Sequence, residues 1–252
     1  MSKSYSKNIP SIQTAMILAA GYATRLRPIS NHTPKAMVQI MGKPILGHIL
    51  ERLKEISLKQ IIVNTHHLGT VVKTYLEQQP KHFNIQISEE KTILETGGGV
   101  KQALPMIGTQ PFYVINGKII WFNGGQNSLL NLASHWNNKT MDVLLLLQPV
   151  TKTVGYQGSG DFHLNADGSL KRRQDDEIAP FVFSGIQIIH PRLFQDSPDG
   201  SFSLNVLYDR AIAQGRLFGV RHDGTWLHIS SPQDILAVEA YLSQHHTNLT
   251  RN

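Results

Sequence analysis

Residues 15–28 read AMILAAGYATRLRP and carry the strongest structural signal in the sequence. Its apolar start, 15–20, predicts a short buried strand. The strand ends at Gly21, a residue that permits unusual backbone torsions and the close approach of a ligand. The backbone N–H groups of such a turn can cradle phosphates. Arg25 adds a planar, permanently charged guanidinium that suits phosphate oxygens.

Two more side chains belong to this turn. Thr24 adds a hydroxyl donor, and Lys35, after Pro34, places a second cation farther along the chain. The turn lacks both the G-x-x-x-x-G-K-[ST] pattern of a P-loop and the G-x-G-x-x-G pattern of a dinucleotide-binding fold. By itself, a glycine followed four residues later by an arginine is more often an ordinary strand-to-loop turn with solvated arginines.

Short apolar runs alternate with stretches of helical spacing over residues 15–150. We predict strands at 15–20, 60–64, 84–88, 111–116 and 142–148, and helices at 45–56, 70–78, 99–106 and 129–136. This alternation implies βαβ units, right-handed crossovers and a mostly parallel sheet that is covered on both faces. The fold class is therefore α/β, with ligands expected at the carboxyl ends of the strands.

After residue 150 the expected strands become shorter and are broken by turns. They lie at 161–164, 170–172 and 181–189, and helices are expected at 204–213 and 232–243. We interpret this half as a lid or substrate-binding region on the same sheet and not as an independent domain. The predicted organisation is a flexible tail at 1–14, one domain at 15–242 with halves 15–150 and 151–242, and a polar C-terminal tail at 243–252.

The composition excludes several classes of protein. The chain has 252 residues, of which 40% are hydrophobic and 17% are charged, so it can bury a sizeable core and is not globally disordered. It has no cysteine, which excludes a disulfide scaffold, a cysteine nucleophile and a thiolate zinc site. No stretch approaches the roughly 18 apolar residues of a membrane span, and the polar start argues against a secretory signal. The predicted location is the cytoplasm, with no membrane partner.

The net charge of +6 fits either a nucleic-acid binder or an enzyme for small anionic substrates. The basic residues are scattered along the chain. Their largest cluster, at 171–173, is followed at once by the acidic residues 175–177. We therefore predict no nucleic-acid partner, and the sequence carries no signal of the oligomeric state.

A composite of motifs extends the first turn. It joins L-A-A-G-x-x-T-R-L-R-P at 18–28 to T-P-K-x-M-V at 33–38 and G-K-P-I-L at 42–46, and it resembles the signature of sugar-1-phosphate nucleotidyltransferases. The resemblance continues through V-N-T-H-H-L (63–68), L-E-T-G-G-G-V-K-Q-A-L-P (94–105), G-D-F (160–162), F-S-G (183–185) and G-T-W-L-H (224–228). Within this family, the chain is similar to bacterial N-acetylmuramate-1-phosphate uridylyltransferases and to mannose-1-phosphate guanylyltransferase-like proteins.

The resemblance implies a Rossmann-like, three-layer α/β/α nucleotidyltransferase fold with a smaller sugar-binding lid region. It also implies a reaction in which an NTP and a sugar 1-phosphate give an NDP-sugar and pyrophosphate. The sugar phosphate oxygen attacks the α-phosphorus in line. Because both reactants are anions, the site must neutralise charge and hold the geometry, and in the family Mg²⁺ with carboxylate ligands does much of this. UTP and N-acetylmuramate 1-phosphate are the favoured substrates, and GTP and mannose 1-phosphate are the rivals.

The resemblance further implies roles for individual residues. Arg25 would be catalytic by binding the β- and γ-phosphates, and Lys35 by stabilising the α-phosphate. The nucleotide-binding residues would be Leu18, Ala19, Ala20, Gly21, Thr24, Arg25, Asn64, Gly98 and Asn116. The sugar-phosphate-binding residues would be Glu95, Asp161, Ser184, Gly185 and Trp226.

Plainer structural roles stay open for some of these residues. The glycines at 97–99 are also typical of a helix-entry turn, Asp161 is typical of a turn, and Trp226 is typical of a core. His66 and His67 suggest a metal pair. However, adjacent residues of a strand point to opposite faces, which favours a structural or base-contacting role for them.

The sequence departs from the family pattern where the metal is expected. The family has an aspartate two residues after the strand-ending asparagine, whereas here Asn116 and Gly117 are followed by Lys118. A lysine has no acceptor for a hard cation. His228 occupies the second carboxylate position, so no metal ligand is intact. At about 4 Å and an effective dielectric of about 20, each unit charge pair is worth about 4 kcal/mol, so Mg²⁺ binding should be badly weakened.

Two functional hypotheses follow from this departure. In the first, the protein is a transferase in which Lys118 itself pairs with the phosphates, with Asp223 or Asp209 as a substitute carboxylate. In the second, it is a catalytically impaired nucleotide- or NDP-sugar-binding protein that acts as a sensor or regulatory subunit. The second rests on the phosphate-binding turn, which is intact.

Overall fold

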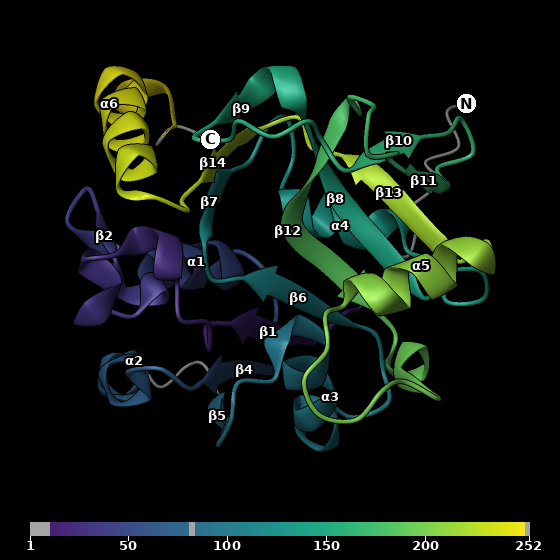
Figure 1. Ribbon diagram of the computed structural model, residues 1–252, viewed down its shortest axis with the longest axis horizontal. Helices are drawn as coiled ribbons and strands as arrows, with labels where there is room; N and C mark the ends of the chain where they lie inside the picture. Colours follow the sequence, from purple (N-terminus) through teal and green to yellow (C-terminus); the bar gives the residue numbers. More distant parts are fainter. Residues whose placement is uncertain (1–10, 81–83, 250–252) are drawn as a thin grey trace, which may run out of the picture.

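The computed structural model describes residues 11–80 and 84–249, and its centre is a nine-stranded mixed sheet (Figure 1). The strand order is β11-β10-β12-β6-β1-β4-β5, and β8 joins β12 to β13. These strands are β1 (Thr14–Leu18), β4 (Gln60–Thr65), β5 (Ile85–Glu89), β6 (Phe112–Asn116), β8 (Val143–Pro149), β10 (Phe162–Leu164), β11 (Leu170–Arg172), β12 (Phe181–Ile189) and β13 (Leu217–Arg221). The predicted α/β class is confirmed.

The parallel part of the sheet, β6-β1-β4-β5, positions the phosphate-binding turn. Leu18, the last residue of β1, is paired in register with Asn64 on β4 and with Asn116 on β6. The two asparagines therefore flank the point where the chain leaves β1. This is the carboxyl edge of the strands, where ligands of α/β folds bind.

Helices cover both faces of the sheet, which gives the three layers that the resemblance implies. The helices are α1 (Ile45–Lys54), α2 (Gly69–Glu77), α3 (Glu95–Ile107), α4 (Ser128–His135), α5 (Asn205–Ala213) and α6 (Pro232–Leu249). Buried residues of α1, α2, α4 and α6 belong to one hydrophobic cluster, and those of α3 and α5 belong to a second. None of these helices, within the part of the chain that the structure describes, is long and apolar enough to cross a membrane.

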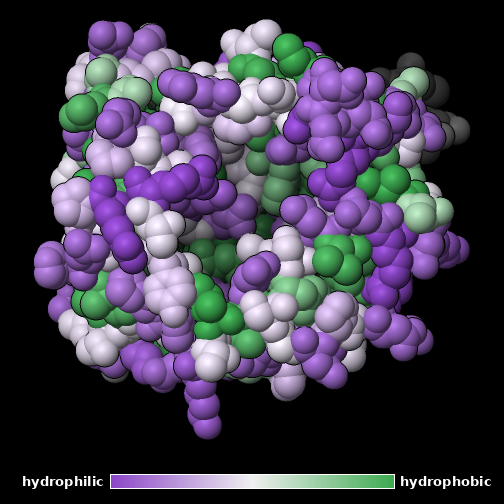
Figure 2. Space-filling model, in the orientation of Figure 1, coloured by the Kyte–Doolittle hydropathy of each residue, from purple (hydrophilic) through white to green (hydrophobic). Residues whose placement is uncertain are grey.

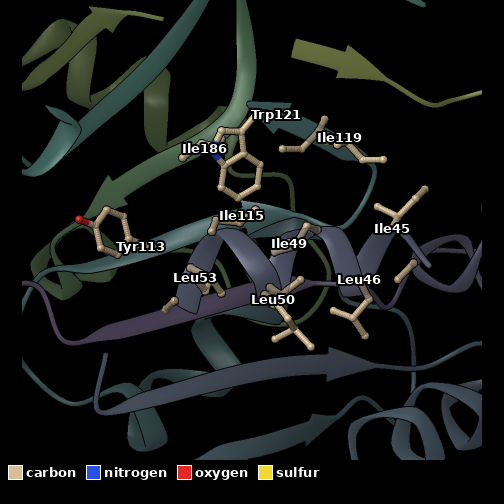
Figure 3. Close-up of a cluster of buried hydrophobic side chains, with 14 of the residues drawn as sticks. Ile45, Leu46, Ile49, Leu50, Leu53, Tyr113, Ile115, Ile119, Trp121 and Ile186 are labelled. Carbon is tan, nitrogen blue, oxygen red and sulfur yellow. The ribbon is translucent and has the colours of Figure 1, made fainter. Parts of the chain in front are cut away.

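Strand β1 shows why the core strands read as continuous apolar runs. Ala15 and Ile17 pack in the cluster on the α1 side, while Met16 packs in the cluster on the α3 side, and all three are fully buried. A sheet covered on both faces requires apolar side chains in both directions. In Figure 3, Ile49 of α1 lies close to Ile115 of β6 in the first of these clusters.

A small second sheet lies beside the first and was not predicted. It consists of β7 (Ile119–Phe122), β14 (Thr225–His228) and β9 (Thr153–Val154), in the order β7-β14-β9. Two further short strands, β2 (Gln39–Ile40) and β3 (Lys43–Pro44), form a hairpin. In the second sheet, His228 pairs with Ile119, and the Ile229 N–H donates to the Lys118 carbonyl oxygen at 3.1 Å. The second sheet therefore holds Lys118 and His228 near each other.

The predicted tails are shorter in the structure. Thr14 belongs to β1, Ile12 is buried, and the Gln13 carbonyl oxygen accepts a hydrogen bond from the Lys59 N–H at 2.8 Å. At the other end, α6 continues past Leu242 to Leu249, so the tail predicted from 243 onward is largely helical. Residues 1–10 and 250–252 lie outside the described residues. The two predicted halves share one sheet, because β12 lies between β6 and β8.

Candidate active site

Two adjoining cavities open at the carboxyl edge of the parallel strands. Figure 2 shows the molecular face hollowed near its centre, over the region between β7 and β12 in Figure 1. The first cavity, of about 380 Å³, is lined by the β1 turn, by Lys35, and by residues from β4, β6 and the start of α3. The second, of about 330 Å³, is lined by residues of β12 and β14 and by Arg25, Asp161 and Arg172. Asn116 and Lys118 line both cavities.

A buried chain of hydrogen bonds fixes the turn after β1. The Ala19 N–H donates to Asn64 Oδ1 at 2.7 Å, and Asn64 Nδ2 donates to Glu90 Oε1 at 2.7 Å. The other Glu90 oxygen accepts from the Leu94 N–H at 3.0 Å, just before α3 begins. Because both polar atoms of the Asn64 amide are already bonded, its main contribution is to position the turn. Sequence reasoning missed Glu90, an acid that follows the predicted strand at 84–88.

Gly99 leaves the room that this chain of hydrogen bonds needs. A Cβ at Gly99 would lie 2.6 Å from Glu90 Oε1 and 2.9 Å from Asn64 Nδ2. We expect Gly99→Ala to lower the free energy of unfolding by about 1–3 kcal/mol through overpacking. Gly21→Ala is a matched control, because no atom of the residues that the structure describes lies within 4 Å of its added Cβ. Urea denaturation midpoints of the two variants measure the difference, and equal midpoints would contradict the tight packing at Gly99.

The predicted nucleotide-binding residues divide into three groups, one of which is Arg25 alone, since it lines only the second cavity. Those that line the first cavity are Leu18, Ala19, Ala20, Gly21, Asn64 and Asn116. Thr24 and Gly98 line neither cavity, and their predicted nucleotide contacts stay predictions. Thr24 begins a 3-10 turn. Gly98 is enclosed in α3, where a Cβ would lie 2.1 Å from the Gly200 carbonyl oxygen, so it permits close packing of the chain.

Most of the predicted sugar-side residues line the second cavity. Asp161, Ser184, Gly185 and Trp226 do so, whereas Glu95 lines the first cavity at the start of α3. Asp161 Oδ2 accepts from the Phe183 N–H at 2.8 Å. Burial raises the pKa of the Asp161 carboxyl.

Trp226 belongs to both the core and the cavity wall. It is 1% exposed, and its indole N–H donates to the Ser184 carbonyl oxygen at 2.7 Å. Its ring stacks on His228, with centroids 5.5 Å apart and 20° between the planes. Gly185, at φ +85°, passes so close to Asn116 that a Cβ would lie 2.9 Å from its Nδ2. The wall of the second cavity is therefore built from tightly packed backbone and rings.

Three cations gather where the cavities meet. Burial lowers the pKa of Lys35 to about 7, and the charges of Lys118 and Arg25 add to the shift. The pKa of Lys118 is also lowered, by burial and then by Arg25. Asp234, which sequence reasoning missed, acts in the opposite direction on Lys35. Such a concentration of buried positive charge suits an anionic ligand.

The residues at the junction do not fit a Mg²⁺ ion. No group of three or more His, Asp or Glu side chains in the described residues could hold a metal. Burial and the charge of Lys118 lower the pKa of His228 to about 4, so the imidazole is neutral, and its Nδ1 lies 3.3 Å from the Gly155 carbonyl oxygen. Mg²⁺ prefers oxygen ligands, and Lys118 offers a charge of the wrong sign.

The proposed substitute carboxylates lie elsewhere, which corrects that expectation. Asp223 accepts from the Gly125 N–H at 3.0 Å, and Asp209 is paired with Arg172 at 2.6 Å. Neither lines the two cavities that meet at Lys118. The junction therefore depends on its cations.

His66 and His67 have structural contacts and line neither cavity. His66 Nδ1 lies 2.9 Å from the Glu90 carbonyl oxygen, and its Nε2 lies 3.2 Å from the Tyr22 hydroxyl. His67 Nε2 lies 3.1 Å from the Ser30 carbonyl oxygen. Both histidines follow β4, which ends at Thr65, so the alternation of a strand does not apply to them, and both rings pack against the Tyr22 ring with centroids 5.5 Å apart.

Comparisons with known proteins agree with this geometry. The family model described as nucleotidyl transferase matches residues 14–157. A protein of Caulobacter vibrioides, named N-acetylmuramate alpha-1-phosphate uridylyltransferase, is 40% identical over 91% of this chain and 97% of its own length. A protein of the same name from Neisseria meningitidis serogroup B is 33% identical over 86% of this chain and 93% of its own length.

Solved structures share the fold. A UDP-glucose pyrophosphorylase complexed with UDP-glucose superposes with a TM-score of 0.76 at 17% identity, covering 92% of this chain and 99% of that chain. HddC from Yersinia pseudotuberculosis, complexed with GMP-PN, gives a TM-score of 0.73 at 22% identity, covering 91% of this chain and 100% of that chain. Together with the family model and the two similar proteins, this shows that the chain belongs to the sugar-1-phosphate nucleotidyltransferases, as its motifs predicted.

Proposed function

We propose that the chain transfers the uridylyl group of UTP to N-acetylmuramate α-1-phosphate. A phosphate oxygen of the sugar phosphate attacks the α-phosphorus of UTP, the bond from that phosphorus to the β-phosphate bridging oxygen breaks, and pyrophosphate leaves. The observation that carries the proposal is the 40% identity, over nearly the whole of both chains, to a protein of that name. The cavity pair supports it, because one cavity suits each reactant.

We assign the first cavity to the nucleotide. The turn of Ala19, Ala20 and Gly21 presents backbone N–H groups to the triphosphate, as small-residue turns after strands do. Lys35 stabilises the α-phosphate, and Arg25, which lines the second cavity at the junction, binds the β- and γ-phosphates. The Asn64–Glu90 hydrogen bonds keep the turn in place before the nucleotide arrives, which reduces the entropy lost on binding.

Lys118 takes over part of the charge that a metal supplies in relatives. It lines both cavities, so its ammonium lies where the two phosphates must approach each other. Two anions repel strongly in a site from which water is excluded, and a fixed cation between them lowers that cost. The Gly117 N–H, bonded to the Leu18 carbonyl oxygen at 2.9 Å, and the bond from Ile229 to the Lys118 carbonyl oxygen hold the backbone there.

The alternative function is that of an impaired enzyme that binds a nucleotide or an NDP-sugar and acts as a sensor. The observation that favours it is Lys118 at the position of a metal-binding carboxylate, with no metal-holding group among the described residues. The cavity and its cations would bind a ligand in either case. The two functions differ in turnover and not in binding.

A pyrophosphate-release assay separates these functions. The protein is incubated with Mg²⁺, each common NTP, and N-acetylmuramate 1-phosphate or a panel of hexose 1-phosphates. We expect turnover with UTP and N-acetylmuramate 1-phosphate. Turnover only with GTP and mannose 1-phosphate would replace the proposed substrates. If folded protein still binds UTP but releases no pyrophosphate with any pair of NTP and sugar 1-phosphate, the sensor function is favoured. The cytoplasmic location stays a prediction.

A further inference from the structure

Arg172 is a cation in the second cavity that the phosphate chemistry leaves unused. It lies on β11, paired in register with Phe162 of β10, and it lines the cavity with Ser184 and Trp226. Its neighbour Arg173 does not line the cavity and instead bonds backbone carbonyl oxygens, including that of Gly160 at 3.1 Å. Of the two arginines, only Arg172 faces the site.

The guanidinium of Arg172 is held in place but incompletely bonded. Its Nε donates to Asp209 Oδ1 at 2.6 Å, and its Cζ lies 5.2 Å from the centre of the Phe162 ring. Its Nη2 is shielded from solvent and has no hydrogen-bond partner among the described residues. The Arg172 side chain as a whole keeps 34% of its surface exposed and lines the cavity, so a ligand in the cavity can reach it.

Arg172 and Lys118 line the second cavity together with Asp161. The charges of both cations act on the Asp161 carboxyl, whereas the charges that act on Lys118 are those of Arg25 and Asp161. A cavity with a cation at each of two places suits a ligand with two anionic groups. One group is the phosphate, at Lys118 and Arg25.

We propose that Arg172 binds a carboxylate on the sugar and thereby selects an acidic sugar 1-phosphate over its neutral counterpart. The inference rests on the proposed function, because N-acetylmuramate differs from N-acetylglucosamine by a lactyl ether that carries a carboxylate. A guanidinium is well suited to this group, since its planar set of N–H donors matches the two carboxylate oxygens. Asp209 and Phe162 orient the guanidinium for that contact.

The test compares two ligands that differ only in the lactyl ether. N-acetylmuramate 1-phosphate and N-acetylglucosamine 1-phosphate are titrated calorimetrically into protein saturated with the α,β-methylene analogue of UTP, which cannot be turned over. We expect the unaltered protein to bind the acidic sugar about tenfold or more tightly than the neutral one, the range of one charge-assisted hydrogen bond. Arg172→Gln should reduce this ratio to within about threefold and leave the affinity for the neutral sugar unchanged.

Two control variants separate recognition from structure. Lys171→Gln removes an exposed charge from the same strand, and Asp209→Asn breaks the ion pair but keeps the guanidinium. Lys171→Gln should retain the preference for the acidic sugar in full. Asp209→Asn should retain part of it, because the guanidinium keeps its charge but loses the carboxylate that orients it. An unaltered protein without the preference would overturn the inference, as would Arg172→Gln protein that retains it or loses affinity for both sugars equally.

The binding ratio is independent of turnover. A failed pyrophosphate assay with a preserved ratio would refute the proposed transferase and keep the inference about Arg172. If the protein turns over UTP and N-acetylmuramate 1-phosphate but Arg172→Gln leaves the binding ratio of the two sugars unchanged, the proposed function is kept and the inference about Arg172 is refuted. If Arg172→Gln does not fold, Arg172→Lys provides the comparison, because it retains the charge without the planar fork and should give an intermediate ratio.

Discussion

Lys118→Asp is expected to make UTP binding dependent on Mg²⁺. The unaltered protein should bind UTP in EDTA within about threefold of its affinity in Mg²⁺, since Lys118, Lys35 and Arg25 already supply positive charge at the junction. The carboxylate of the variant would face the triphosphate with charge of the same sign. Because a unit charge pair at about 4 Å is worth about 4 kcal/mol, a loss of about 100-fold or more in EDTA is expected.

Mg²⁺ should restore binding to the Lys118→Asp variant, because the new carboxylate is an oxygen ligand for it. Lys118→Met is the matched control, since it removes the charge without adding an acceptor. Its affinity should fall in both conditions and gain nothing from Mg²⁺. Fluorescence titration of a labelled UTP analogue, with and without EDTA, measures all three proteins. A strong Mg²⁺ requirement in the unaltered protein would contradict the role given to Lys118.

The strands and helices of the parallel core were predictable because the local sequence pattern of each element reflects its burial. Strands such as β1 are buried on both faces, so they are apolar throughout, and the helices between them repeat at helical spacing. The second sheet was not predictable in this way. Its strand β9 has 2 residues and β14 has 4, and β14 pairs with β7 from a distant part of the chain. Such short strands form because the rest of the fold brings them together.

The candidate site was predictable where a motif specifies the backbone and less so where long-range contacts decide. The turn at Gly21, Arg25 and Lys35 were predicted from a motif, and in the structure they line the two cavities. Glu90 and Asp234 were missed, because a carboxylate acquires its role only from the groups that the fold brings to it. A helix-entry turn was the plainer role left open for the glycines at 97–99, and the helix was predicted from 99, whereas α3 begins at Glu95 and these glycines allow it to pack closely against neighbouring backbone.

Nucleotide binding is expected to take up a proton through Lys35. Its pKa of about 7 in the free protein follows from burial and from the nearby charges of Lys118 and Arg25, so much of it is neutral at about pH 8. A bound triphosphate raises this pKa, because its negative charge favours the ammonium. Binding is therefore strongest below the pKa that Lys35 has in the free protein, and it weakens as the pH rises through about 7. Lys118, whose pKa is also lowered, changes affinity in the same direction.

Calorimetry in buffers of different ionisation enthalpy measures the proton uptake. The range from about pH 7.5 to about pH 9 avoids the titration of the terminal phosphate, whose second pKa is about 6. Lys35→Met should lower the proton uptake and flatten the pH dependence, and turnover should fall by about 100-fold or more with loss of a fixed cation at the reacting phosphate. Lys171→Gln, which removes an exposed lysine outside both cavities, should keep the uptake. An affinity for UTP that does not change over this pH range would mean that Lys35 stays charged in the free protein. A group of the protein itself, and not the bound nucleotide, would then offset the desolvation cost of the buried ammonium.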